Sequence, residues 1–289
     1  MTDAALMKGR RGLVMGVAND HSIAWGIARM LAAQGAEIAF TYQGDAQAKR
    51  LRPLAESIGS KLVLPGDVED DAQLDAAFET LKREWGSLDF LVHAIAYSDK
   101  NELKGRYVDT TRENFARSLS ISCYSFTAVA RRAARLMSTD MGHGGGAMVT
   151  LTYLGASRVM PNYNVMGVAK AALEASVRYL AADLGHDGIR VNAISAGPMR
   201  TLAGSAVGDA RLVFKWNKAH SPLKKTIELE HVGGAALYLL SELAAGVTGE
   251  VHFVDAGFNV VGMPPTADLK GWVAPEGGDG EKSNGNGQR

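Results

Sequence analysis

Two tyrosines and a lysine between positions 153 and 170 are the residues of this chain best suited to chemistry. Tyr163 and Lys170 are seven residues apart, and from Pro161 the run reads as a helix, on which such positions return to nearly the same face. A phenol and an ammonium on one stripe can serve one substrate or cofactor, and the cation favours the ionised phenol. The pair also fits a helix with a half-buried tyrosine and a solvated lysine, so the pattern needs support from elsewhere.

Short apolar runs alternate with helical patterns along most of the chain. Strands are expected at 12–15, 37–41, 61–64, 88–94, 147–151, 189–194 and 250–254, and helices at 23–34, up to 58, and at 70–85, 111–137, 161–185 and 230–241. Unbroken apolar strands that alternate with helices predict a parallel sheet covered on both faces. Right-handed crossovers then give a doubly wound, Rossmann-like α/β fold.

The domain organisation follows from the same reading. Residues 8–263 contain neither repeat nor linker, which predicts a single domain, whereas residues 264–289 change to Pro, Gly, Ser, Asn and charge and predict a disordered tail. Residues 196–226 form an unusually long connection between two strands. Such connections in compact domains are typical of lids or binding loops, so we expect a substrate-binding lid there.

The composition of the 289 residues argues against several classes of protein. Lys and Arg together equal Asp and Glu at 31 each, which argues against nucleic-acid binding or adsorption to a membrane. The chain starts polar and has no apolar stretch near the ~18 residues of a membrane span, so a cytoplasmic protein is expected. Cys123, the single cysteine, reads as a small core residue, and the histidines lack a metal-binding spacing, so we expect no metal.

A strand-to-helix turn near the N-terminus suits a nucleotide. Gly16 stands at the bend, where it lets the backbone approach a pyrophosphate, and the following helix offers its N–H groups. Ser22 stands at the N-cap position and its hydroxyl could bind phosphate. The turn departs from G-x-G-x-x-G because the loop is longer and Ser22 replaces a glycine. An ordinary capped helix therefore remains an alternative.

The ends of the next strands favour NADH. Gln43 follows the second strand and can bond a ribose hydroxyl, and no cation precedes Lys49 to neutralise a 2′-phosphate, so NADH is expected over NADPH. Asp67, after the third strand, can accept from the adenine amino group, although a helix N-cap is an equal alternative. Small Ala94 follows the fourth strand, where a backbone can pass close to the cofactor.

At this point the residues match a family. The chain resembles the bacterial NADH-dependent enoyl-acyl-carrier-protein reductases of fatty acid synthesis, a divergent branch of the short-chain dehydrogenase/reductase superfamily. The similarity runs from Lys8 to Met263. It is carried by Gly16-Val-Ala, Ser22-Ile-Ala, Phe40-Thr-Tyr-Gln43, Tyr153-Leu-Gly-Ala, and the runs 161–170 and 190–202. Ordinary members of the superfamily place Tyr and Lys four apart, and the wider spacing with a second tyrosine is similar to the enoyl reductase branch.

The resemblance implies an activity and a set of residues. Hydride would pass from NADH to the β-carbon of a trans-2-enoyl thioester, and Tyr163 would stabilise the enolate oxygen. Lys170 would hold the nicotinamide ribose and bias Tyr163, while Tyr153 would line the acyl pocket. The residues implied for the cofactor are Gly16, Ser22, Ile23, Gln43, Asp67, Val68, Ala94, Ile95, Lys170, Met199, Thr201, Leu202 and Ala203. Those implied for the substrate are Ser98, Tyr153, Tyr163, Ala203 and Val207.

The same resemblance implies partners. Acyl carrier protein would deliver the substrate, the chain would form a homotetramer, and residues 199–220 would close over the substrate as a lid. Arg131, Arg132 and Arg135 lie on one predicted helix and read as a solvated face or as part of a patch for the acidic carrier. Tyr97 and Ser98 depart from the family pattern Gly-Phe-Ala, which leaves the response to pocket-filling inhibitors open.

Two other functions compete with this reading. A 3-oxoacyl reductase of the superfamily would need lysine four positions after Tyr163, where Gly167 stands. A catalytically silent dinucleotide-binding protein, acting as an NADH sensor or oligomer scaffold, would need neither phenol. Coenzyme A as the carrier of the acyl group is left open by the sequence, as is the source of the final proton.

Overall fold

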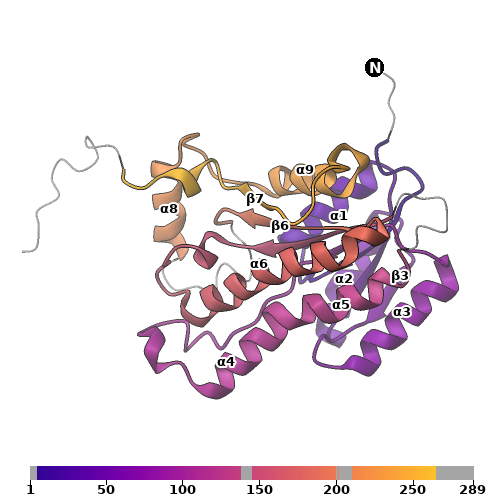
Figure 1. Ribbon diagram of the computed structural model, residues 1–289, viewed down its shortest axis with the longest axis horizontal. Coiled ribbons are helices and arrows are strands. Elements are labelled where there is room, and N and C mark those ends of the chain that lie inside the picture. Colours follow the sequence, from indigo (N-terminus) through magenta and orange to yellow (C-terminus); the bar gives the residue numbers. More distant parts are fainter. Residues whose placement is uncertain (1–4, 138–144, 200, 202–209, 265–289) are drawn as a thin grey trace, which may run out of the picture.

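The computed structural model describes residues 5–137, 145–199, 201 and 210–264. Its seven strands form one parallel sheet in the order β3-β2-β1-β4-β5-β6-β7, flanked by helices (Figure 1), which confirms the doubly wound, Rossmann-like α/β fold. The elements of the sheet and its helices are β1 (Arg11–Met15), α1 (Ile23–Ala33), β2 (Glu37–Tyr42), α2 (Asp45–Ser57), β3 (Leu62–Pro65), α3 (Asp71–Trp85), β4 (Phe90–His93), α4 (Arg112–Leu119), α5 (Ser125–Ala134), β5 (Ala147–Thr152), α6 (Asn164–Leu184), β6 (Arg190–Ala196), α8 (Ala210–His220), α9 (Leu229–Leu240) and β7 (Val251–Val254).

The core lies in two layers, one on each face of the sheet. Val14 of β1 packs into the layer formed with α1, α2 and α9, whereas its neighbours Leu13 and Met15 pack into the layer formed with α3, α5 and α6. Side chains alternate across a strand, so a sheet covered on both faces needs apolar residues at every position. This explains the unbroken apolar runs, and each large side chain fully buried there contributes about 1.5–3 kcal/mol.

The strand order reverses direction between β1 and β4, and this sets the place of the site. The chain passes from β1 outward to β2 and β3, then returns to β4 on the other side of β1. The connections after β1 and β4 therefore leave the carboxyl edge in opposite directions and open a crevice. Gly16 and Ala94 follow these two strands directly.

The predicted long helix of residues 111–137 is interrupted. α4 ends at Leu119, a π-helical turn follows at Ser120–Tyr124, and α5 resumes at Ser125. The defining contact is the Ser125 N–H, which donates to the carbonyl of Ser120, five residues back. The helix expected from Pro161 begins at Asn164, with Tyr163 as its N-cap residue.

Two arginines contribute to packing between elements. Arg132 of α5 is buried and donates to Asp75 at 2.6 Å and to Asp71 at 2.9 Å, which joins α5 to α3. The grouping of Arg132 with Arg131 and Arg135 on one solvated face or carrier patch was therefore wrong, because its guanidinium faces inward while the other two are exposed. Arg190 donates to the carbonyls of Leu239, Ser241 and Val247, which satisfies the end of α9.

Within the described residues, no helix is long and apolar enough to cross a bilayer.

Candidate active site

The nucleotide side of the crevice depends on a close approach of two backbones. Gly16 has a positive φ of 98°, and a Cβ there would overlap the Ala94 carbonyl oxygen. The Ala94 N–H in turn donates to the Met15 carbonyl at 3.1 Å. A side chain at position 16 would thus meet backbone that cannot move, and its absence leaves the turn open to a ligand, as a pyrophosphate cradle requires.

Ser22 organises the turn that follows Gly16. It is the N-cap residue of α1, as predicted, but its hydroxyl makes no bond to the helix. The Ser22 Oγ instead accepts from the N–H groups of Ala18 and Asn19, at 3.0 and 3.1 Å, and donates to Asn19 Oδ1 at 3.3 Å. Its contact with phosphate stays a prediction, and the N–H groups of the first turn of α1 are the donors at this end.

The ribose side contains two of the predicted residues in contact. Gln43 Nε2 donates to Asp67 Oδ2 at 3.1 Å, so the ends of β2 and β3 are joined by the side chains assigned to ribose and adenine. The N-cap of α3 is Asp70, which excludes the alternative reading of Asp67. A carboxylate beside Gln43 disfavours a 2′-phosphate. The helix α2 nevertheless places the Arg52 guanidinium 5.8 Å from the Tyr42 ring, a cation that sequence spacing did not predict here.

The two predicted catalytic phenols meet. The rings of Tyr153 and Tyr163 are 5.1 Å apart and edge to face, at 73°. Tyr163 is 9% exposed and lies in an apolar cluster with Leu103 and Met166. Gly155, in the short turn after β5, lies under the Tyr163 ring, because a Cβ on Gly155 would overlap that ring. Tyr163 also stands between two asparagines with positive φ, Asn162 and Asn164, the kind of local strain that concentrates at functional sites.

Lys170 approaches the same end of β5. Its Nζ donates to the Leu151 carbonyl at 2.7 Å, two residues before Tyr153, and the side chain is buried. Burial lowers the pKa of Lys170 to about 8, against smaller effects of Cys123 and Glu174. Lys170 therefore bonds to the end of β5, the strand that leads into Tyr153.

Both phenols have a raised pKa, whereas the sequence led us to expect a neighbouring cation to favour the ionised form of Tyr163. Burial raises the pKa of Tyr163, and the neighbouring Tyr153 and Glu174 raise it further. Burial likewise raises the pKa of Tyr153 to about 12, with a smaller effect of Asp255. Removing a phenolate from water is costly, so both phenols are protonated hydrogen-bond donors at neutral pH.

His93, at the end of β4, is a buried group that the sequence analysis missed. Its Nδ1 lies 3.1 Å from Thr150 Oγ1 and its Nε2 lies 2.8 Å from Ser125 Oγ, so it joins β4 to β5 and α5. Burial, followed by the charge of Lys170, lowers the pKa of His93 to about 3. A histidine within an apolar strand gave the only sequence signal of this connection.

The sequence analysis also missed a hydrogen-bonded pair near Lys170, formed by Thr152 and Glu174. Thr152 Oγ1 donates to Glu174 Oε1 at 2.7 Å, and burial raises the pKa of Glu174. Glu174 follows Lys170 by one helical turn, which is a spacing that could have indicated the pair. The bond ties α6 to the strand end that carries Tyr153.

The remaining predicted residues divide between two groups. Ile23, Val68, Ile95, Met199 and Thr201 follow or adjoin the carboxyl ends of strands and are partly exposed. Leu202, Ala203 and Val207 of the predicted lid, and residues 265–289 of the predicted tail, lie outside the described residues. Their roles stay predictions. In the part of the chain that the structure describes, no three His, Cys, Asp or Glu residues are grouped so as to hold a metal ion.

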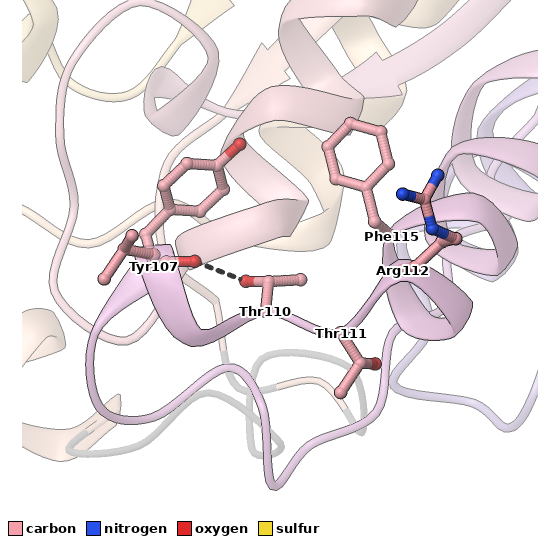
Figure 2. A pocket seen from close by; sticks show the side chains of 6 residues that line it. Tyr107, Thr110, Thr111, Arg112 and Phe115 are labelled. Carbon is pink, nitrogen blue, oxygen red and sulfur yellow. Dashed lines mark hydrogen bonds between the residues drawn. The ribbon is translucent and has the colours of Figure 1, made fainter.

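An open hollow of about 500 Å³ borders the aromatic cluster without containing the predicted site. It is lined by Tyr107, Val108, Thr110, Thr111, Arg112 and Phe115. Figure 2 shows the rings of Tyr107 and Phe115 on either side of Thr110, whose hydroxyl donates to the Tyr107 carbonyl at 2.7 Å. Phe115 also packs against the cluster of Tyr163. The hollow and the cluster of Tyr163 therefore share the side chain of Phe115.

Comparison with known proteins identifies the family. A family model described as enoyl-(acyl carrier protein) reductase matches residues 16–259. The chain belongs to this family. A relative from Rhizobium meliloti, named enoyl-[acyl-carrier-protein] reductase [NADH] 2, is 63% identical over 265 residues, which cover 92% of this chain and 97% of the relative. The resemblance stated from the sequence is confirmed.

Solved structures of this family agree in fold. The enzyme from Anaplasma phagocytophilum, in complex with NAD, is 58% identical with a TM-score of 0.86 and covers 90% of this chain and 97% of its own. The enzyme from Bacillus cereus, with NADP+ and indole naphthyridinone, is 50% identical with a TM-score of 0.86, covering 89% and 99%. Both nicotinamide dinucleotides thus occur in structures similar to this enoyl reductase.

Proposed function

We propose that Tyr163, Tyr153 and Lys170 carry the reaction of this enoyl-(acyl carrier protein) reductase. The reaction is reduction of the trans-2 double bond of an enoyl thioester by NADH, the last step of the fatty acid elongation cycle. The observation that supports the assignment is the meeting of two protonated phenols and a buried lysine at the end of β5. This edge adjoins the crevice beside Gly16.

The residues present fit a dinucleotide. The cradle left by Gly16 and the N-terminus of α1 suit a pyrophosphate, the Gln43–Asp67 pair suits an adenosine, and Lys170 suits the hydroxyls of the nicotinamide ribose. NADH supplies the hydride when bound. The Lys170 ammonium has three donors, of which the Leu151 carbonyl takes one, so two remain for ribose hydroxyls.

Tyr163 acts as a hydrogen-bond donor to the thioester oxygen. Negative charge grows on that oxygen as the β-carbon is reduced, and a protonated phenol in a dry site stabilises it strongly. The raised pKa of Tyr163 keeps its proton in place for this task. Tyr153 packs edge to face against Tyr163, which fixes the ring and forms the adjoining wall for the acyl group.

The partners follow from the family. Acyl carrier protein presents the enoyl group as a thioester, and the chain acts in the cytoplasm as a homotetramer of domains that span residues 8–263. The exposed rings of Tyr124, at the end of the π-helical turn before α5, and of Tyr179 on α6 support association, because large aromatic side chains in solvent favour burial against another chain.

The test follows NADH absorbance with the purified chain. With crotonyl thioesters of acyl carrier protein we expect oxidation of NADH, slower turnover with coenzyme A thioesters and a much higher KM for NADPH. A 3-oxoacyl thioester should give no turnover, because Gly167 stands where that chemistry needs lysine. Turnover of the 3-oxoacyl but not the enoyl thioester would contradict the assignment, and equal use of NADPH would contradict the argument from Gln43 and Asp67.

A further inference from the structure

The loop that leaves β4 beside the cofactor crevice is held by a stripe of three polar side chains, Asn114, Ser118 and Ser122. The stripe lies on the helical rod formed by α4, the π turn and α5, residues 112–134. Asn114 Oδ1 accepts from the Asp99 N–H at 3.0 Å, and Ser118 Oγ donates to Ser98 Oγ at 2.9 Å. Ser122 completes the stripe at Tyr97. Three successive loop residues, 97–99, are thus bonded to three residues of the rod that are spaced four positions apart, and the two segments run in opposite directions.

A stripe with a period of four does not suit a regular α-helix. Each step of four residues turns about 400°, so the third member would lie roughly 80° from the first. The π turn of Ser120–Tyr124 widens the helix at this point, since the Ser125 N–H bonds five residues back. A π turn contains more than 3.6 residues, so Ser122 lies on the same side of the rod as Asn114 and Ser118. The π turn therefore aligns the three side chains of the stripe.

The hydroxyl of Ser122 bonds to both the N–H and the carbonyl group of Tyr97. The Tyr97 N–H donates to Ser122 Oγ at 2.9 Å, and Ser122 Oγ donates to the Tyr97 carbonyl at 3.0 Å. Ser122 is fully buried. A single hydroxyl with both bonds fixes the position and the orientation of the Tyr97 backbone, whereas Tyr97 itself points its ring to solvent under Arg117, whose guanidinium is 4.6 Å away.

The same turn also reaches the catalytic helix. The π turn packs against α6, which carries Lys170, and Cys123 Sγ lies 3.5 Å from Ser176 Oγ of α6. The β4 exit carries the predicted substrate residue Ser98, and α6 begins directly after the predicted catalytic Tyr163. The π turn therefore links the two elements on which the predicted thioester site depends.

We propose that Ser122 is a positioning residue for the reduction, which holds the Tyr97–Ser98 backbone at the distance from α6 that the enoyl thioester requires. The inference rests on the proposed function. It goes beyond the family's Tyr and Lys because the Ser122 hydroxyl acts through the backbone of Tyr97. A competing account makes Ser122 an ordinary buried hydroxyl whose loss lowers only stability.

The experiment compares Ser122→Ala with Ser125→Ala. Ser125 is an equally buried serine of the same rod whose hydroxyl bonds to Ile121 and His93 and not to the loop. We expect Ser122→Ala to lower kcat/KM for crotonyl thioester about tenfold to a hundredfold, with the Kd of NADH unchanged. Ser125→Ala should lower the midpoint of urea unfolding and leave kcat/KM within about twofold of wild type.

Two further measurements separate the accounts. Hydrogen exchange of the 94–101 segment should quicken in Ser122→Ala and not in Ser125→Ala, since only the former frees the Tyr97 amide. Ser122→Cys, with a weaker donor, should fall between Ala and wild type, and it replaces Ser122→Ala if that variant fails to fold. Equal kcat/KM in the two alanine variants, or unchanged exchange at 94–101, would overturn the proposal. An inactive wild-type chain would overturn the proposed function itself.

Discussion

The two sides of the crevice are built by different means. On the nucleotide side, Gly16 brings the backbone of β1 against the Ala94 carbonyl, and the contact is between main chains. On the phenol side, Gly155 lies against the Tyr163 ring, and the contact is between a turn and a side chain. The first can only be lost when the backbone moves. The second involves a side chain, so a substitution of Tyr163 can alter the site while the fold stays intact.

The largest expected effect comes from breaking the nucleotide side. Gly16→Ala adds a methyl where φ is 98° and where the Ala94 carbonyl leaves no room. We expect loss of more than about 3 kcal/mol of unfolding free energy, together with NADH binding, because both strain and overlap must be relieved by backbone movement. Urea unfolding and quenching of NADH fluorescence measure the two effects.

Gly234→Ala is the matched control for that change. It adds the same methyl inside α9, where no atom lies within 4 Å, so the variant should be neutral or up to about 1 kcal/mol more stable. Similar losses in both variants would show that the chain tolerates no added methyl in general. The special role of position 16 would then be refuted.

Removing one phenol tests the other side of the comparison. Tyr163→Phe keeps the ring on Gly155 and removes only the donor, so kcat should fall about 10²–10³-fold while stability and the Kd of NADH hold. Stopped-flow oxidation of NADH with crotonyl thioester gives kcat directly. Tyr153→Phe should cost less, because Tyr153 is placed beside the reacting oxygen and not on it. An unchanged rate in Tyr163→Phe would refute the donor role.

The nucleotide side of the crevice could be predicted from the sequence, because its residues lie at the ends of strands. Gly16 and Gln43 follow a strand directly and Asp67 follows one by two residues, and strand ends are fixed by the pattern of apolar runs. The strands were therefore placed within two or three residues at each end, and the crevice followed from topology. Tyr153, Tyr163 and Lys170 were found because they lie on one short stretch of chain.

Contacts between distant elements could not be predicted in this way. The long helix was expected to be regular, and nothing in Ser120–Tyr124 reveals an i to i+5 bond. The stripe Asn114, Ser118 and Ser122 was visible as polar residues at a period of four, but its meaning depends on where the β4 exit runs. The pKa of Tyr163 is raised, opposite to expectation, because burial, which spacing does not report, is the largest effect on this phenol.

His93 joins β4 to β5 and α5, and its lowered pKa predicts how the free energy of unfolding depends on pH. Its pKa is about 3 in the folded chain and about 6.5 in a solvated histidine. Below pH 6.5 the unfolded chain takes up a proton that folded His93 refuses, so stability falls as the pH falls toward 3, by roughly 2 kcal/mol at pH 5. Urea unfolding at pH 7 and pH 5 measures this loss.

The comparison variant for that experiment is His93→Gln. Glutamine does not titrate, so the variant should be less stable at pH 7 and lose about 2 kcal/mol less than wild type between pH 7 and pH 5. Carboxylates elsewhere respond alike in both chains. Equal losses on acidification would show that His93 accepts its proton while folded.

Lys170 gives the smallest effect and joins the two sides, because it belongs to the phenol cluster and is proposed to hold the nucleotide. Burial lowers its pKa to about 8. Above that pH the ammonium loses a proton and a donor, so the Kd of NADH should rise by up to about tenfold per pH unit. Fluorescence titration from pH 7 to pH 9.5 measures it, and Lys170→Met should bind weakly at every pH.

The sign of the stability change separates this effect from alkaline unfolding. A lysine with a lowered pKa holds fewer protons in the folded chain than in the unfolded one between pH 8 and its ordinary 10.5. The contribution of Lys170 to stability therefore grows with pH in that window, while its contribution to NADH binding declines. If NADH binding weakens above pH 8 while the Lys170-dependent part of the unfolding free energy rises, the lysine ammonium is a ligand of the cofactor. A parallel decline of binding and stability, or a Kd that does not change with pH, would exclude this role of Lys170.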